Sequence, residues 1–175
     1  MTDLCFTSAR KLARLLRSRR LSATEVMKAF IAQVERVNPK VNAIVTFLPE
    51  AALAAAKKFD RNFKANKARP LAGLPIAYKD NVPTRGICTT FGSPVYRDNV
   101  PSEDHLIVER LTAAGAITLG KTNLPEFAAG SHTFNAVFGA TLNPCDLTKS
   151  AGGSSGGAAA AVRSEERRVG KECRL

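Results

Sequence analysis

The sequence has few of the residues that build metal sites: two histidines and four cysteines in 175 residues. The cysteines, at positions 5, 88, 145 and 173, are far apart and none is in Cys-x-x-Cys spacing. Zinc sites usually need such ligands at close, regular intervals. We therefore expect no metal site, and we interpret the cysteines as isolated thiols of the core or surface.

Long hydrophobic runs are also missing. No stretch approaches the roughly 20 uncharged apolar residues that cross a bilayer, and residues 1–12 lack the apolar centre of a secretory signal. The sequence therefore predicts no membrane association and a cytoplasmic location. The hydrophobic content of 45% is still sufficient for one globular domain with a substantial core.

Acidic residues are few, 15 against 26 basic ones, which gives a formal net charge of +11. An excess of this kind is typical of proteins that bind nucleic acids. Most of the basic residues, 17 of the 26, fall in segments 10–20, 57–69 and 163–175, with almost no aromatic residues among them to stack on bases. Solvated helix faces explain this distribution more simply, so we expect no direct binding of nucleic acid.

Helical and strand-like patterns alternate along the chain. Leu12, Leu15 and Leu16 recur at helical spacing. Ser22-Ala-Thr-Glu25 is a capping box, which predicts a helix that ends at Asn38-Pro39. Further helices are predicted over 49–66 and 104–114, strands over 43–48, 73–78 and 116–119, and loops over 93–101 and 124–150. This order predicts a layered α/β domain.

Residues 150–162 read Ser-Ala-Gly-Gly-Ser-Ser-Gly-Gly followed by small residues. Composition alone favours a flexible Gly/Ser linker. A nucleotide phosphate loop is less well supported, because no Lys-Ser or Lys-Thr pair follows the glycines. A catalytic loop is the third interpretation, since glycines let the backbone approach a ligand closely.

Lys79 directly follows the apolar segment Gly73–Tyr78, which predicts an amine at the end of a strand, near the core. Taken alone, such a lysine is more often a surface lysine, here paired with Asp80. A lysine accepts a proton only when it is neutral, so a catalytic role requires burial to lower its pKa from about 10.4.

Five motifs in order resemble the amidase signature family over residues 21–162. They are Gly-Leu-Pro-Ile-Ala-Tyr-Lys-Asp-Asn from 73, Thr-Thr-Phe-Gly-Ser at 89–93, Gly-Ala-Ile-Thr-Leu-Gly-Lys-Thr-Asn-Leu-Pro-Glu-Phe at 115–127, Phe-Gly-Ala-Thr-Leu-Asn-Pro at 138–144 and the glycine-serine loop. The resemblance implies a layered α/β/α fold with a mixed central sheet, here truncated, on which the N-terminal helices pack.

The resemblance also implies a Ser-Ser-Lys amide hydrolase that works through an acyl-enzyme, without metal or organic cofactor. Lys79 matches the general base and Ser154 the bridging serine, which in the family follows a cis peptide bond. Ser131 is a candidate for lining the acyl pocket, although a loop serine that bonds its own backbone explains it equally well. The residues that match the supporting loop are Gly152, Gly153, Ser155, Gly156 and Gly157.

In the family the nucleophilic serine follows the bridging serine by roughly two dozen residues, which is beyond Leu175. We therefore expect residues 1–162 to form the N-terminal part of an amidase-signature domain that is inactive alone. From Arg163 the sequence becomes abruptly charged, and residues 163–173 resemble a translated sequencing adapter, so we expect residues 163–175 to be a non-native tail. The alternative is a genuine basic C-terminal helix.

Three hypotheses of function remain open. The first is an amidase that acts on a small carboxamide. The second is the glutaminase component of a tRNA-dependent amidotransferase, which would require partner subunits. The third is a non-catalytic interaction module on the same scaffold.

Overall fold

The computed structural model describes residues 4–164. Its longer elements are three N-terminal helices, a fourth that precedes the last strand of the main sheet, and a C-terminal helix. Along the chain the elements are η1 (Leu4–Phe6), α1 (Ala9–Arg17), α2 (Ala23–Val41), β1 (Ile44–Phe47), α3 (Pro49–Arg61), α4 (Phe63–Asn66), β2 (Pro75–Lys79), η2 (Pro94–Tyr96), α5 (Leu106–Ala113), β3 (Ile117–Thr122), η3 (Glu126–Ala128), β4 (Phe134–Asn135), β5 (Gly139–Ala140), β6 (Leu142–Asn143), β7 (Asp146–Ser150) and α6 (Gly156–Ser164).

The main sheet has the strand order β1-β3-β2 and is mixed. Strand β3 runs antiparallel to β1 and parallel to β2. In the parallel pair Tyr78 lies opposite Lys121 and Lys79 opposite Thr122. This register places the carboxyl ends of β2 and β3 at one edge, where the chain leaves both strands.

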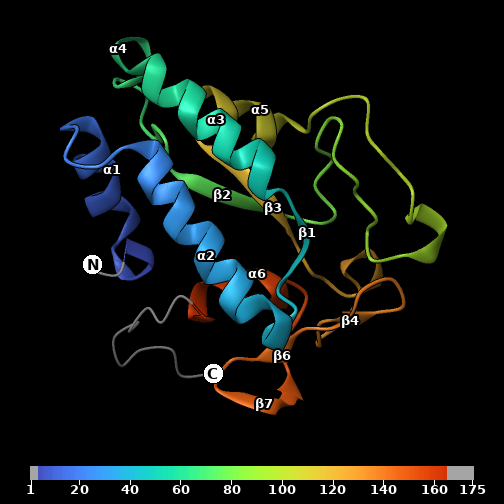
Figure 1. The fold of residues 1–175 in the computed structure, drawn as a ribbon. Coiled ribbons are helices and arrows are strands. Elements are labelled where there is room, and N and C mark those ends of the chain that lie inside the picture. The colour runs from blue at the N-terminus through green and yellow to red at the C-terminus, as the bar shows by residue number, and fades with distance from the viewer. Residues whose placement is uncertain (1–3, 165–175) are drawn as a thin grey trace.

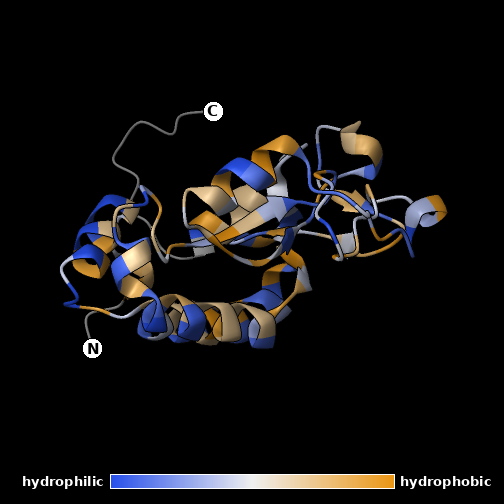
Figure 2. Cartoon of the chain, turned by 90° about the horizontal axis from the view of Figure 1, so that it is seen from above, coloured by the Kyte–Doolittle hydropathy of each residue, from blue (hydrophilic) through white to orange (hydrophobic). Residues whose placement is uncertain are grey.

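Helices cover both faces of this sheet. In Figures 1 and 2, α2 and α3 lie on one side of the strands and α5 on the other. Hydrophobic and hydrophilic residues alternate along the covering helices in Figure 2, as expected of helices that bury one face. The predicted layered α/β fold with a mixed sheet and packed N-terminal helices is confirmed.

The main core joins the N-terminal helices to the sheet. Leu16 of α1, Met27 of α2 and Ala56 of α3 are almost fully buried, and they pack in one cluster with Leu119 of β3. Within residues 4–164, no helix combines the length and the apolar character needed to cross a bilayer.

The start of α2 is fixed by two sets of hydrogen bonds. The predicted capping box is confirmed: Ser22 accepts from the backbone N–H of Glu25, whose carboxylate accepts from the backbone N–H of Ser22. From α3, the Asp60 carboxylate accepts from the backbone N–H groups of Ala23 and Thr24, at 2.8 and 2.9 Å. A distant side chain therefore supplements the local cap.

Replacing Asp60 with alanine is expected to lower the free energy of unfolding by about 1–2 kcal/mol, the usual cost of a lost cap. The substitution leaves two N–H groups of α2 without acceptors and removes the bond from the Thr24 hydroxyl. Urea denaturation monitored by circular dichroism measures the loss. Glu50→Ala is the control, because Glu50 is exposed at the start of α3, the helix that carries Asp60. It is expected to change the free energy of unfolding by less than about 0.5 kcal/mol.

The prediction that α2 ends at Asn38-Pro39 is wrong, because the helix continues to Val41. Pro39 lies close to the C-terminal end of α2, where a proline costs only one helical hydrogen bond. The end is set instead by Asn42, which adopts the left-handed conformation at φ 51°. The Asn38 side chain then accepts from the backbone N–H groups of Ala43 and Ile44, which turns the chain into β1.

Other boundaries also differ from the sequence-based prediction. The helix predicted over 49–66 is divided at Asn62 into α3 and α4, and β3 extends to Thr122 rather than ending at Leu119. The predicted loop 124–150 contains four short strands, β4 to β7, joined in two antiparallel pairs. Helix α6 reaches Ser164; residues 165–175, on which most of the predicted tail falls, lie outside the described residues.

Candidate active site

The end of β2 and the glycine-serine loop meet, although they are 75 residues apart in sequence. Lys79 is the last residue of β2, and its Nζ lies 2.9 Å from the Oγ of Ser154. Nζ is also 3.1 Å from the Oγ of Ser155. The two serines precede α6, which contacts all three strands of the main sheet.

The lysine amine is partly buried, and this burial lowers its pKa from the ordinary value of 10.5. A lower pKa increases the fraction of neutral amine, the form that accepts a proton from a hydroxyl. The neighbouring Asp80 does not pair with it. Asp80 is fully buried and accepts from the backbone N–H and the hydroxyl of Thr90, at 3.0 and 2.6 Å.

The loop that carries Ser154 is held by backbone bonds to the segment around Ser131. The Gly153 N–H donates to the Ser131 carbonyl at 2.6 Å, and the Gly153–Ser154 peptide bond is cis, as the resemblance implied. The Thr133 hydroxyl donates to the Gly152 carbonyl and accepts from the Gly156 N–H. Thr133 is fully buried, and no sequence motif had singled it out.

Three of the loop glycines are required by close packing, and at Gly153 a Cβ would overlap the carbonyl oxygen of Gly130. A Cβ at Gly156 would overlap the side chain of Thr133, and one at Gly157 would overlap the backbone of Asn123 and of Ala43. Gly152 is different, because nothing lies near the position that its Cβ would take. The same motif therefore contains glycines that are sterically necessary and one that is not.

A buried lysine beside the site was missed by sequence reasoning. Lys121 of β3 is fully buried and donates to the carbonyl of Val82 and to the hydroxyls of Thr84 and Thr89. Burial lowers its pKa from 10.5 to about 8, and the negative charge of Asp80 opposes this shift. The available signal was a single charge in the otherwise uncharged segment 116–123.

The buried lysine fixes the chain as it leaves the candidate base. The Val82 N–H donates to the Lys79 carbonyl at 2.9 Å, and the Val82 carbonyl accepts from Lys121. Asp80 is tied to β3 by its own N–H, which donates to the Thr122 carbonyl at 3.0 Å. The exit from β2 is thus anchored to β3 at both Asp80 and Val82.

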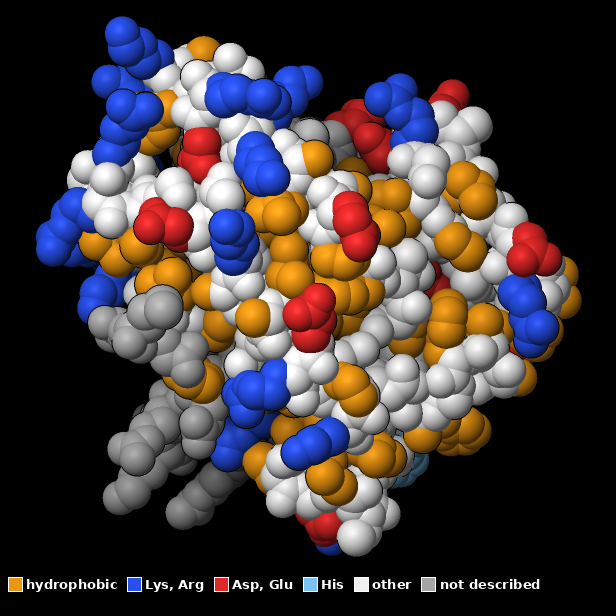
Figure 3. Space-filling model, in the orientation of Figure 1, with side chains coloured by type: hydrophobic (Ala, Val, Ile, Leu, Met, Phe, Trp, Pro, Cys, Tyr) orange, Lys and Arg blue, Asp and Glu red, His pale blue; other side chains and the backbone are white. Residues whose placement is uncertain are grey.

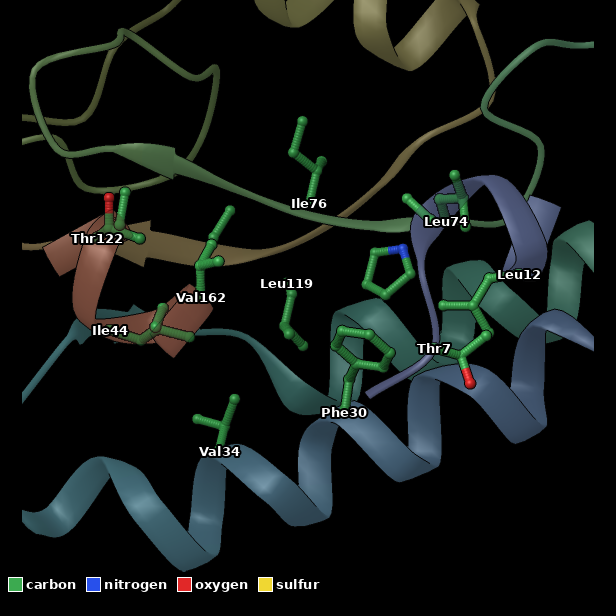
Figure 4. A pocket seen from close by; sticks show the side chains of 15 residues that line it. Thr7, Leu12, Phe30, Val34, Ile44, Leu74, Ile76, Leu119, Thr122 and Val162 are labelled. Carbon is green, nitrogen blue, oxygen red and sulfur yellow. The ribbon is translucent and has the colours of Figure 1, made fainter. Parts of the chain in front are cut away.

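Two hollows lie near this arrangement. Ser131 is exposed and lines an open groove of about 510 Å³ together with Glu126 and Phe134. An apolar cavity of about 300 Å³ lies between α2, the sheet and α6, and Figure 4 shows Phe30, Val34 and Val162 around it. Thr122 lines this cavity and is paired with Lys79 in the sheet. One end of the cavity therefore lies next to the candidate site.

Metal ligands do not gather in the part of the chain that the structure describes: no group of three or more His, Cys, Asp or Glu side chains is placed to hold an ion. Cys88 and Cys145 form no disulfide within residues 4–164, and the Cys5 thiol donates to the Ala29 carbonyl at 3.4 Å.

A lysine amine within hydrogen-bonding distance of a loop serine is also found in serine hydrolases that use lysine in place of histidine. The family model described as Amidase matches residues 25–168, most of the chain. The chain belongs to the amidase signature family. The predicted family, and with it an amidase at the level of the family, is confirmed.

Curated relatives include the A subunit of glutamyl-tRNA(Gln) amidotransferase from two bacteria. The protein of Caldanaerobacter subterraneus subsp. tengcongensis is 43% identical over 164 residues, and that of Lachnospira eligens is 49% identical over 167. These alignments cover 94% and 95% of this chain and 34% of each relative. The chain therefore spans about a third of the length of the curated relatives it matches.

A solved structure, that of 6-aminohexanoate cyclic dimer hydrolase, superimposes with a TM-score of 0.84 at 36% identity. The match covers 94% of this chain and 33% of that one. Both comparisons therefore align nearly all of this chain with only one part of a longer enzyme.

Proposed function

We propose that the chain supplies the general base and the bridging serine of an amide hydrolase that acts through an acyl-enzyme. The observation that carries the proposal is the 2.9 Å separation between Lys79 Nζ and Ser154 Oγ. With the amine neutral, the Ser154 hydroxyl donates to Lys79 and in turn accepts a proton from an attacking serine. The relay needs no metal, since the proton moves only between an amine and hydroxyls.

The proposed route begins with attack of a serine oxygen on an amide carbonyl, while its proton passes through Ser154 to Lys79. The protonated lysine then returns the proton through the same path to the departing amine. Water repeats the sequence in the second half of the reaction and releases the acid. The partial burial of Lys79 assists the first step, because it favours the neutral amine.

The nucleophile itself is not among the residues that match the family motifs. We therefore expect the 175-residue chain not to hydrolyse amides alone. Robust hydrolysis by the purified chain that Lys79→Ala abolishes would contradict this expectation and would place a nucleophile among the residues present.

A chimera tests the proposed relay. Residues 1–162 of this chain are joined to the remaining part of the Caldanaerobacter relative, which is 43% identical where the two align. Lys79→Ala in the chimera is expected to lower kcat by about 10²–10⁴-fold, the usual contribution of a general base. Activity of the unchanged chimera is expected to rise with pH until Lys79 is deprotonated, with a midpoint below 10.5.

Lys149→Ala is the matched control, because Lys149 is exposed on β7 and forms only a surface ion pair with Asp146. Ser154→Ala and Ser155→Ala separate the two serines near the amine: the first is expected to lower kcat as Lys79→Ala does, the second by much less. Full activity of Ser154→Ala would refute the proposed relay. Loss of all activity in the control as well would indicate misfolding of the chimera, which circular dichroism detects.

A second candidate function is that of the glutaminase component of a tRNA-dependent amidotransferase. It is favoured by the amidotransferase relatives, which are 43% and 49% identical to this chain. This function uses the same relay on glutamine and passes ammonia to a partner protein. Glutaminase activity of the chimera that appears only with the companion subunits of the relative supports it, whereas hydrolysis of simple carboxamides without them favours the stand-alone amidase.

A further inference from the structure

The net charge of the chain resides in two short segments. Residues 10–20 and 57–69 contain twelve of the 26 Lys and Arg residues and one of the 15 Asp and Glu residues. The remaining 14 basic and 14 acidic residues balance each other. The two segments, taken together, therefore carry the entire excess of +11.

The fold brings these segments together. The Arg17 guanidinium on α1 donates to the Pro70 carbonyl, which directly follows the second segment, at 3.2 Å. The Arg19 guanidinium lies over the ring of Phe63, 4.6 Å from its centre. Figure 3 shows a group of Lys and Arg side chains over the end of the molecule where Figure 1 places α1, α3 and α4, and more scattered ones elsewhere on this face. We call this surface, residues 10–20 and 57–69, the basic face.

The cations of the basic face are exposed, and none of them forms an ion pair with a carboxylate of residues 4–164. All twelve are exposed, and the one ion pair formed among residues 4–164 lies elsewhere, between Lys149 and Asp146. Asp60, the single acidic residue of the two segments, is half-buried and accepts three hydrogen bonds from Ala23 and Thr24. The adjacent Glu25 is engaged with Ser22 in the capping box.

We propose that the basic face binds the phosphate backbone of a nucleic-acid duplex. The interpretation as separate solvated helix faces treated the two segments independently, and the tertiary structure joins them. The basic face carries twelve exposed cations and one acidic residue, and a duplex carries one phosphate charge per about 1.7 Å of its axis. The positive charge of the face thus has a counterpart of opposite sign in the closely spaced phosphates of a duplex.

The surroundings of the face favour a duplex over a membrane or single strands. Peripheral membrane helices insert large apolar side chains, and none of the exposed large hydrophobic residues belongs to either segment. Bases of a single strand need free aromatic rings for stacking, but Phe63 is covered by Arg19 and Phe59 is buried. Binding is therefore expected to depend on phosphates and to be indifferent to base sequence.

The experiment titrates the full chain into fluorescein-labelled RNA and DNA duplexes of about 20 base pairs and follows fluorescence anisotropy at several salt concentrations. The variant Arg14→Gln/Arg61→Gln/Lys64→Gln removes three exposed charges of the basic face. At about 0.15 M salt, the loss of three phosphate contacts weakens affinity on the order of 100-fold and lowers the salt slope by about 3. The RNA and DNA arms show which duplex form is preferred.

A matched variant, Lys40→Gln/Arg97→Gln/Arg110→Gln, removes the same charge from exposed positions outside the face and is expected to weaken binding only a few-fold. Equal losses in the two variants would overturn the proposal, because net charge alone would then explain binding. Preferential binding to vesicles that contain phosphatidylserine, or to an acidic peptide, would overturn it as well. If circular dichroism shows that the first variant is unfolded, Lys57→Gln/Lys58→Gln/Lys67→Gln provides the same test.

Discussion

Gly157→Ala is expected to lower the free energy of unfolding by about 3 kcal/mol or more, the upper range for overpacking in a site that cannot relax. Its Cβ would overlap the N and O atoms of Asn123 and the carbonyl of Ala43. These backbone atoms cannot move away from the added Cβ, because the Asn123 N–H is hydrogen-bonded to the Ala43 carbonyl at 2.9 Å. Helix α6 must therefore move away from the end of β3.

The same displacement is expected to move Ser154 away from Lys79, since Ser154 lies only three residues before Gly157. Gly152→Ala is the matched control, because no atom lies within 4 Å of the added Cβ and the residue is exposed. It is expected to change stability by less than about 0.5 kcal/mol. Urea denaturation compares the two variants with the unchanged chain, and equal midpoints for the two alanine variants would show that α6 does not pack as described.

Lys121→Met is expected to lower the free energy of unfolding by about 1–3 kcal/mol, the usual cost when a buried polar group loses its hydrogen-bond partner. Three acceptors, the Val82 carbonyl and the hydroxyls of Thr84 and Thr89, lose their donor. Asp80, fully buried, loses the cation that lowers its pKa against the effect of burial. The double variant with Asp80→Asn is expected to be more stable than Lys121→Met alone, because it no longer buries an uncompensated carboxylate.

Two measurements make this prediction specific. Lys149→Met removes an exposed lysine from a surface ion pair and is expected to cost less than about 1 kcal/mol. The pH dependence of stability is the second. Because the folded pKa of Lys121 is about 8 and its ordinary value is 10.5, the unfolded chain binds more protons between these values. Stability therefore gains a contribution as the pH rises through this window, and Lys121→Met is expected to lose that contribution.

The sequence predicted well those features that depend on neighbouring residues. The capping box at Ser22 and Glu25 is satisfied by bonds three residues apart, and it occurs as expected. The same kind of reasoning was wrong at Pro39, where it overestimated a local preference. The Asn38 side chain and the left-handed Asn42 determine the end of the helix instead, and both act through the turn into β1.

Sequence reasoning did not identify Lys121 or Thr133 as parts of the site. Each is an ordinary polar residue in its local context, and its importance comes from groups tens of residues away. Lys121 bonds Thr84 across 37 positions, and Thr133 bonds Gly156 across 23. Which strand ends and loops become neighbours depends on the pairing of β2 with β3, which no single segment specifies.

Residue types and short spacings alone determined three things about this protein: a strand that ends in a lysine, a loop whose glycines permit close approach, and a family resemblance that links them. The tertiary structure alone decided that the two segments meet, which glycines have no room for a side chain, and that two basic segments form one face. The physical reason is range. Caps and turns are closed by bonds within a few residues, whereas the position of a buried amine, a helix start or a charged surface is set by packing between elements far apart in the chain.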